Sequence, residues 1–293
     1  MHDPLGPPVA SVRAAVARAL DEDLTPLGDI TSALLPPDLH ASGDFVARSP
    51  GVLAGVACAA EAFAQIDPSV VVTWFAGDGD DVDSKQVLGR VHGPLPSILT
   101  AERTALNFLC HLSGVATQTR RFVDAARASG GQARIWDTRK TTPGLRSLEK
   151  AAVRSGGGSN HRGNLSDWVL LKDNHLVHLS IEDAVVKSRR TWPARTVHVE
   201  CDHLAQVERA LAAGADALLL DNMTPDEVRR CVDAAERHAE SHGGRRPLLE
   251  VSGNVTLETV GGYATTGVDC ISSSALTQSA PALDIGLDIE VAA

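Results

Sequence analysis

Six short apolar runs, separated mostly by segments of helical periodicity, fill the chain beyond about Gly131 and limit what it can fold into. The runs are ARIWD, WVLLK, TVHVEC, ALLLD, PLLEVS and CISS. This alternation predicts a parallel sheet built from βα units. No Gly-x-Gly-x-x-Gly turn follows the first run, so the six units favour a closed or nearly closed barrel over a dinucleotide-binding sheet.

One helix of this part is marked especially well by its first residues. Thr224 can cap it, Pro225 suits its first position, and Glu227 completes a capping box three residues after the cap. The sequence therefore predicts a helix that begins at Pro225, directly after the ALLLD strand.

The first hundred or so residues have a different pattern, which predicts a mixed α+β unit. Apolar residues at helical spacing predict a surface helix over residues 9–20, stopped by the acidic residues 21–23. Residues 45–56 and 70–75 are strand-like, residues after Gly77 are rich in loop formers, and residues 97–110 return to a helical pattern.

Charge and cysteine content exclude several classes of partner. The formal net charge is −10 with no basic run, which argues against nucleic acid and anionic membranes. The five cysteines are widely spaced and form no C-x-x-C pair, so we expect reduced thiols and a cytoplasmic protein without a disulfide framework or zinc site. The first residues lack the pattern of a signal peptide, and no stretch of about 18 apolar residues predicts a membrane span.

Polar and charged side chains stand where each apolar run ends. They are Thr138, Arg139 and Lys140; Lys172 and Asp173; Glu200; Asp221 and Asn222; Ser252 and Gly253; and Ser272, Ser273 and Ser274. In a β/α barrel the carboxyl ends of the strands meet on one face, so these residues are predicted to form one site. A charged group directly beside a buried run is costly unless it is paired or binds a ligand.

The predicted site has a cationic half and an acidic half. The cationic half holds Arg139, Lys140, Arg146, His161, Arg162 and Lys172, which suit carboxylate and phosphate groups. Glu200 and Asp221, with Asp173 as a third candidate, are hard oxygen ligands that suit Mg²⁺ held together with substrate phosphates. An anionic substrate with Mg²⁺ indicates a phosphate or pyrophosphate ester.

Two turns fit phosphate binding. Ser252-Gly253 precedes a helix expected near Thr256, and residues 272–275 form a similar turn after the last strand. Glycines 156–158 precede Asn160, His161 and Arg162. Taken alone, the glycine triplet also fits a plain loop, and the serines also fit a helix cap. His161 could equally be a solvated loop residue. For His175 we expect a structural hydrogen bond. No Ser/His/Asp or Cys/His signature indicates covalent acyl chemistry.

Five longer strings identify a family. They are DTRKTTPGLRSLEKAAV (residues 137–153), GGGSNHRGNLSDWVLLKDNH (156–175), VECD (199–202), LLLDNM (218–223) and GLDI (286–289), and they resemble quinolinate phosphoribosyltransferase, also called nicotinate-nucleotide pyrophosphorylase (carboxylating). GDITS (28–32) and ERTALNFLCHLSGVAT (102–117) resemble the same family. The resemblance is colinear over nearly the whole chain.

The resemblance implies a two-domain fold of the α/β class. An N-terminal α/β sandwich, residues 1–112, is joined by residues 276–293, and residues 113–275 form an open barrel of about seven strands. It also implies a homodimer, in which Arg103 of one subunit reaches the site of the other.

The resemblance further implies a role for each site residue. Arg139, His161, Arg162 and Lys172 would hold the two carboxylates of quinolinate, with Thr138 beside them, and Lys140 would contact both substrates. Glu200 and Asp221 would engage the ribose hydroxyls and Mg²⁺, and Ser252, Gly253, Asn254, Ser272, Ser273 and Ser274 the 5′-phosphate. Lys140, Lys172, Glu200 and Asp221 are the catalytic candidates. The implied reaction joins quinolinate to phosphoribosyl pyrophosphate and gives nicotinate mononucleotide, pyrophosphate and CO₂.

Four positions depart from the family pattern: Asn164, Asn254, Ser274 and Gln278. Because asparagine tolerates positive φ, both asparagines are expected to keep the backbone path of the residues they replace. The departures leave two alternatives open: a diverged phosphoribosyltransferase for another heteroaromatic acid, and a non-catalytic phosphoribosyl-binding protein.

Overall fold

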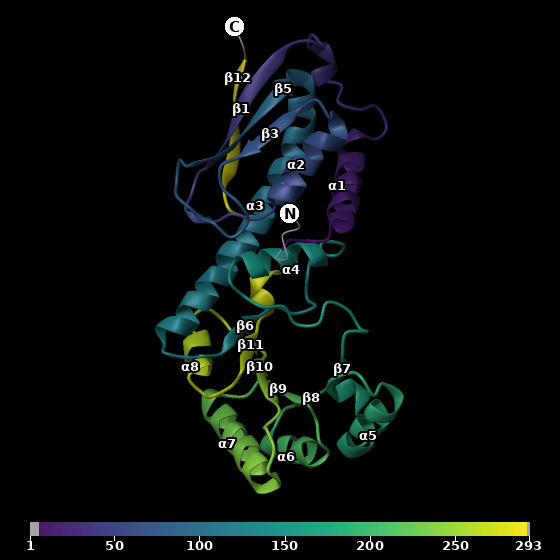
Figure 1. Ribbon diagram of the computed structural model, residues 1–293, viewed down its shortest axis with the longest axis vertical. Helices are drawn as coiled ribbons and strands as arrows, with labels where there is room; N and C mark the ends of the chain where they lie inside the picture. Colours follow the sequence, from purple (N-terminus) through teal and green to yellow (C-terminus); the bar gives the residue numbers. More distant parts are fainter. Residues whose placement is uncertain (1–5, 292–293) are drawn as a thin grey trace. The chain divides into compact units, whose positions relative to one another are not determined.

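The computed structural model describes residues 6–291, which divide into two compact units. The first takes residues up to Arg120, Thr141–Gly157 and the residues from Leu276 onward. The second takes Arg121–Lys140 and Gly158–Ala275. Each is therefore assembled from separate stretches of sequence (Figure 1).

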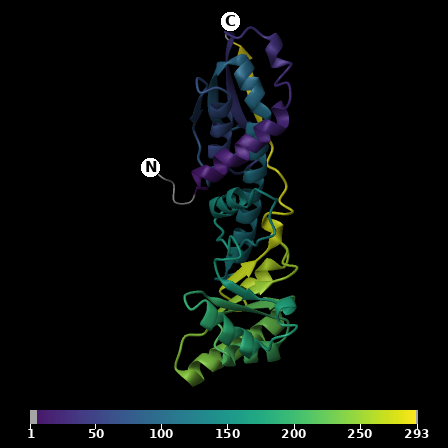
Figure 2. The same ribbon diagram turned by 90° about the vertical axis from the view of Figure 1, so that its right-hand side faces the viewer.

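The first unit is built on a four-stranded antiparallel sheet. The strand order is β12 (Ile285–Val291), β1 (His40–Ala47), β5 (Val87–Pro94) and β3 (Val71–Trp74). Its helices are α1 (Val9–Leu24), α2 (Val56–Ile66), most of α3 (Leu95–Ala128) and α4 (Arg146–Ser155), and β2 (Gly51–Val52) pairs with β4 (Asp81–Val82). Strand β12, drawn in yellow in Figure 2, comes from the end of the chain and pairs with β1. The sheet is therefore complete only when the last residues of the chain join it.

An aromatic cluster lies in the core of this unit. Phe45 of β1 is fully buried, stacks on Trp74 of β3 with ring centroids 4.9 Å apart, and meets Phe63 of α2 edge-on at 6.0 Å. The alternation of side chains along β1 places Phe45 toward α2, so one strand joins the sheet to its helical layer.

Several predicted boundaries in this unit are wrong. Helix α1 continues through the acidic residues to Leu24, because an acidic cluster on a solvent-facing helix is tolerated. The predicted strand 45–56 is divided among β1, β2 and the start of α2. The region after Gly77 contains β5, which pairs on both sides; its Gly89, Gly93 and Pro94 imitate turn signals.

The second unit confirms the predicted parallel sheet. The order is β6 (Arg134–Trp136), β11 (Cys270–Ser272), β10 (Leu248–Ser252), β9 (Ala217–Asp221), β8 (Val197–Cys201) and β7 (Val169–Leu171), with every pair parallel. Each of the six apolar runs forms one strand. Within the described residues β6 and β7 remain edges, and the place of a seventh strand beside β6 is taken by a single bridge between Trp136 and Ser159.

Helices follow the strands of this sheet in the order α5 (Ile181–Thr191), α6 (Leu204–Ala212), α7 (Pro225–His242) and α8 (Val260–Ala264). The capping box of α7 is confirmed, since Thr224 accepts from the backbone of Glu227 and the Glu227 side chain accepts from the backbone of Thr224. The helix expected near Thr256 begins only at Val260 and is five residues long.

Among residues 6–291, no helix combines the length and the apolar character needed to cross a bilayer. All five cysteines fall in this range and are free thiols. Burial raises the pKa of Cys58 and of Cys201 to about 12, so both thiols stay protonated at neutral pH.

Candidate active site

A cavity of about 500 Å³ opens where the strands of the second unit end. It is lined by Thr138, Arg139, Lys140, His161, Arg162, Leu170, Lys172, Leu219, Asp221, Asn222, Glu250, Ser252, Gly253, Asn254 and Ser272. These residues come from the carboxyl ends or inner faces of β6, β7, β9, β10 and β11, and from the loop that carries His161 and Arg162. Residues more than a hundred positions apart therefore face one cavity.

The predicted site residues fall into three groups. Twelve of them line the cavity: Thr138, Arg139, Lys140, His161, Arg162, Lys172, Asp221, Asn222, Ser252, Gly253, Asn254 and Ser272. Asp173, Glu200, Ser273 and Ser274 lie in the same unit but not in the lining. Arg103 is exposed on α3, and it belongs with Arg146 to the first unit.

The loop that delivers His161 is held by a buried carboxylate. Asp137, which follows β6 and is fully buried, accepts from the backbone of His161 at 2.8 Å and from the Asn160 side chain at 2.6 Å. The His161 ring packs against two neighbouring indoles, with centroids 5.8 Å from Trp136 and 5.0 Å from Trp168. The ring is only 7% exposed, which shows that it is a built part of the cavity and not a solvated loop residue.

Two arginines share the cationic wall. Arg162 is 7% exposed, and Arg139 is half-buried beside it. Burial lowers the pKa of the Arg162 guanidinium, and the positive charge of Arg139 lowers it further, although Asp167 and Glu250 oppose the shift. Two like charges in a poorly solvated wall are costly, and an anion that enters the cavity relieves that cost.

Another part of the site carries an ion pair and a second carboxylate. Lys172 Nζ is hydrogen-bonded to Glu200 Oε2, and Glu200 is 8% exposed. Burial raises the pKa of Glu200 despite the opposing effect of Lys172, and burial likewise raises the pKa of Asp221. Both carboxyls are thus held where a cation or a hydroxyl donor stabilises their ionised forms.

Backbone in the left-handed region forms the turn next to Asp221. Asn222 and Asn254 have φ of 55° and 49°, Gly253 has φ of 92°, and the Asn254 amide donates to Asn222 Oδ1 at 3.2 Å. Asn222 also donates to Asp221 Oδ2 at 2.7 Å. Asn254 therefore takes up the positive φ that asparagine was expected to tolerate. The exposed Asn164 is not among the described residues with positive φ.

Gly253→Ala is expected to destabilise the protein by about 2 kcal/mol, because it adds backbone strain and a steric overlap. A Cβ atom here would lie 2.8 Å from the backbone nitrogen of Asn222, and closer still to its side-chain oxygen. Gly214→Ala is the matched control, since Gly214 also has positive φ, 78°, but its Cβ would meet nothing within 4 Å. Urea unfolding measures both variants. Equal losses would show that the contact with Asn222 contributes nothing.

The turn after β11 differs from the expected helix-terminus site. Ser272 is buried and lines the cavity, but the Ser273 hydroxyl donates to the carbonyl of Val255 at 2.9 Å. A 3-10 turn begins at Ser274, and α8 lies eight residues beyond Ser252, so neither turn has a long helix behind it. Anion binding here would depend on backbone N–H groups and hydroxyls. The prediction that helix dipoles contribute to binding at these two turns is wrong.

His175 has the structural role expected for it, because its Nδ1 accepts from the backbone N–H of Lys172 at 3.0 Å. This bond fixes the loop directly after β7. It thereby helps to place the Lys172 side chain at the cavity.

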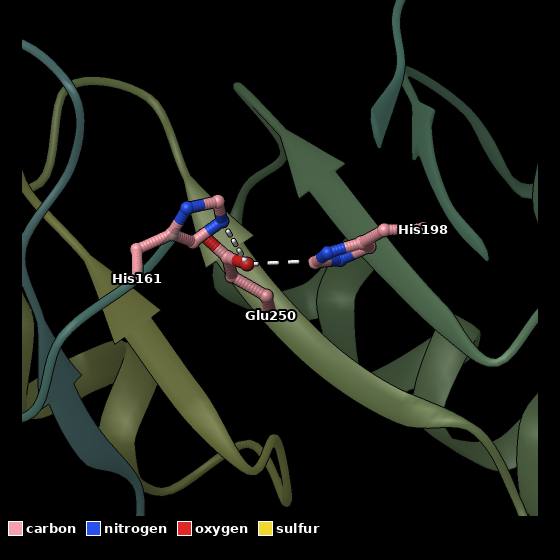
Figure 3. A group of neighbouring side chains, drawn as sticks. All are labelled: His161, His198 and Glu250. Atoms are coloured by element: carbon pink, nitrogen blue, oxygen red, sulfur yellow. Dashed lines mark ion pairs between the residues drawn. The ribbon is translucent and has the colours of Figure 1, made fainter. Parts of the chain in front are cut away.

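Two polar residues of the site escaped the sequence reasoning: Glu250 and its neighbour His198. Glu250 is fully buried in β10, with Oε2 3.2 Å from His161 Nε2 and 3.6 Å from His198 Nε2 (Figure 3). Among the described residues these three side chains form the one group with the geometry of a possible metal site. The available signal was an ionisable residue inside each of the apolar runs VHV and LLEV.

Comparison with known proteins places the whole chain in one family. The family model described as the N-terminal domain of quinolinate phosphoribosyl transferase matches residues 29–113, and the model of its C-terminal domain matches residues 115–288. The chain is 42% identical over 283 residues to the nicotinate-nucleotide pyrophosphorylase [carboxylating] of Mycobacterium leprae, covering 95% of this chain and 97% of that protein. It is 39% identical to quinolinate phosphoribosyltransferase [decarboxylating] 2a, mitochondrial, of Nicotiana tabacum, over 97% and 83% of the two chains.

Solved structures agree with the sequence matches. The nicotinate-nucleotide pyrophosphorylase of Francisella tularensis superposes with a TM-score of 0.89 at 36% identity, covering 97% of both chains. NadC from Streptococcus pyogenes gives a TM-score of 0.90 at 34% identity over 100% of both chains. On its sequence and its fold, the chain belongs to the quinolinate phosphoribosyltransferase family.

Proposed function

We propose that the protein transfers the phosphoribosyl group of phosphoribosyl pyrophosphate to quinolinate and decarboxylates the product to nicotinate mononucleotide. The observation that carries this proposal is the pair of arginines in the cavity wall. Arg162 is nearly inaccessible and is repelled by Arg139, so this wall is suited to an anion with more than one negative charge. The two carboxylates of quinolinate meet that requirement.

The two sides of the cavity divide the work. Arg139, Arg162, His161 and Lys172 bind the dicarboxylate and hold the ring nitrogen against the anomeric carbon. The turn at Asn222, Gly253 and Asn254, together with Ser252 and Ser272, binds the 5′-phosphate through its N–H groups and hydroxyls.

Departure of pyrophosphate leaves positive charge at the anomeric carbon. Asp221, in the lining, and Glu200, behind Lys172, supply negative charge that stabilises it. Alkylation makes the ring nitrogen cationic, and the substrate itself then stabilises the carbanion that forms as CO₂ leaves. A proton, ultimately from solvent, then takes the place of CO₂ on that carbon. The task of the protein is orientation and exclusion of water.

Mg²⁺ is the metal we propose for this reaction. Asp221 and Glu200 fit it, because both are oxygen donors whose pKa burial raises and because the charge of Asp221 raises the pKa of Glu200 further. These two carboxylates, with pyrophosphate oxygens, would hold the ion. When bound, it would neutralise charge on the leaving group.

We further propose that the protein works as a homodimer in which Arg103 of one subunit completes the site of the other. Arg103 is exposed on α3, where another subunit can reach it, which supports a role across subunits. Five free thiols support a reducing compartment such as the cytoplasm, and the net charge of −10 supports small-molecule partners rather than nucleic acid or membrane.

Incubation of the purified protein with Mg²⁺, phosphoribosyl pyrophosphate and quinolinate carrying a ¹⁴C label in its 2-carboxylate tests the proposal. Labelled CO₂ and nicotinate mononucleotide should form in equal amounts, and nicotinate in place of quinolinate should give far less product. Turnover only with another heteroaromatic acid would identify a diverged transferase. Tight binding of phosphoribosyl pyrophosphate without turnover of any acid would identify a non-catalytic binding protein.

A further inference from the structure

Glu250 is a fully buried carboxylate whose described ion-pair partners are two histidines. Its Oε2 lies 3.2 Å from His161 Nε2 and 3.6 Å from His198 Nε2, and the two rings stack at 6.1 Å (Figure 3). Burial alone would raise the pKa of Glu250, but the contact with His161 and the charges of both rings outweigh it and lower the pKa. The carboxylate is therefore kept ionised inside the sheet.

The three residues differ in their exposure to the cavity. His161 and Glu250 line the cavity, whereas His198 does not and is 2% exposed. His198 therefore contacts Glu250 without lining the cavity itself. An ionised carboxylate can only accept hydrogen bonds, so a favourable contact with it requires a proton on His161 Nε2.

Glu250 adds a charged side-chain contact to the environment of the His161 ring. Asp137 holds the backbone of His161, and Trp136 and Trp168 stand against its ring. Apolar walls fix the position of a ring but do not decide which nitrogen carries the proton. Figure 3 shows the second ring nitrogen, Nδ1, on the far side of the ring from Glu250.

We propose that Glu250 is a positioning residue that orients the His161 ring for dicarboxylate binding. This inference rests on the proposed function. By holding Nε2 in its protonated form, Glu250 directs the remaining nitrogen of His161 toward the ligand. The carboxylate acts through His161 and touches no reacting atom.

A divalent metal is the rival occupant of this cluster, because two imidazoles and a carboxylate are common zinc ligands. The local charge favours the ion-paired arrangement instead. Arg139 and Arg162 line the same cavity, and two fixed guanidinium charges beside the cluster repel a dication.

Glu250→Gln keeps the shape of the side chain and removes its charge. The KM for quinolinate is expected to rise by about tenfold, the effect of losing one charge-assisted contact, while the KM for phosphoribosyl pyrophosphate changes by less than about twofold. Glu182→Gln on α5 is the matched control, since it breaks an ion pair with Arg209 at 2.8 Å outside the cavity lining and should leave both KM values unchanged. Equal increases in both KM values for Glu250→Gln would contradict a positioning role.

A double-mutant cycle tests whether Glu250 acts through His161. In a His161→Gln background, Glu250→Gln should add little to the KM for quinolinate, because the ring that it orients is gone. Independent, additive losses would overturn the proposal. Thermal unfolding of each variant shows whether the fold is retained.

Ring ¹⁵N spectra of histidine-labelled protein separate this proposal from the proposed function. The His161 signals, assigned by their loss in His161→Gln, should show a protonated Nε2 in the wild type and a changed Nε2 shift in Glu250→Gln. An unchanged shift would refute the inference even in an active enzyme. If quinolinate is not a substrate, the proposed function fails, but the ¹⁵N shift of His161 still reports whether the His161–Glu250 contact exists. Tight binding of one Zn²⁺ per chain, lost in Glu250→Gln, would show a metal site and also overturn the proposal.

Discussion

Lys172→Met is expected to lower kcat/KM for quinolinate by about a hundredfold to a thousandfold, because it removes a preorganised charge from the centre of the site. Lys172 lines the cavity and neutralises the buried Glu200. The variant would therefore lose a contact to the substrate and leave a carboxylate without its ammonium partner. Steady-state kinetics with each substrate varied in turn would measure the loss. Lys187→Met on the exposed face of α5 is the matched control and should retain wild-type activity.

The same variant should show altered pH dependence of stability. Burial raises the pKa of Glu200, and Lys172 opposes that shift, so removal of Lys172 moves the pKa further upward. A carboxyl whose folded-state pKa lies above its unfolded value stabilises the fold at low pH and loses that contribution as pH rises through the folded-state value. The Tm deficit of Lys172→Met should therefore be larger at about pH 8 than at about pH 5. A Tm difference that does not change with pH would mean that another cationic group compensates the charge of Glu200 in the variant.

Arg139→Ala is expected to weaken quinolinate binding by about a hundredfold while changing the affinity for phosphoribosyl pyrophosphate by only a few-fold, since a guanidinium can grip a carboxylate through two charge-assisted hydrogen bonds. Arg139 also lowers the pKa of Arg162 by repulsion, so its loss relaxes the remaining arginine and makes the deficit smaller than two isolated bonds would suggest. Calorimetric titration with each ligand measures both affinities.

Arg134→Ala, at the other end of β6, is the control for Arg139→Ala. Arg134 is exposed at the amino end of β6, whereas Arg139 follows its carboxyl end. The Arg134 variant should bind both ligands as the wild type does. Equal losses of both ligands in Arg139→Ala would mean that Arg139 contacts the phosphoribosyl group as well as the dicarboxylate.

The predictable part of the fold came from residues whose local sequence decides their structure. Apolar runs such as ALLLD can be satisfied only inside a sheet, and Thr224, Pro225 and Glu227 form their cap within one turn of chain. Strand β5 was missed because Gly89 and Pro94 resemble a turn, and only pairing with β1 and β3 makes them part of a strand. Pairing of that kind depends on distant residues.

The candidate site divides in the same way. Lys172 and Asp221 were found because each directly ends an apolar run, where the direction of a parallel strand fixes its position. Glu250 and His198 lie within their runs, where sequence shows only an interrupted apolar pattern. Their meaning depends on His161, which another segment brings to within 3.2 Å of Glu250.

The position of β12 in the first sheet has a consequence for protein synthesis. Its residues, Ile285–Val291, pair with β1 across seven positions, yet they leave the ribosome after the entire second unit. Until then β1 presents an unpaired edge that can recruit strands from other nascent chains. Cells that make this protein quickly should therefore need chaperones most during the last stage of translation, and a shortened C-terminus should cause aggregation before it impairs catalysis.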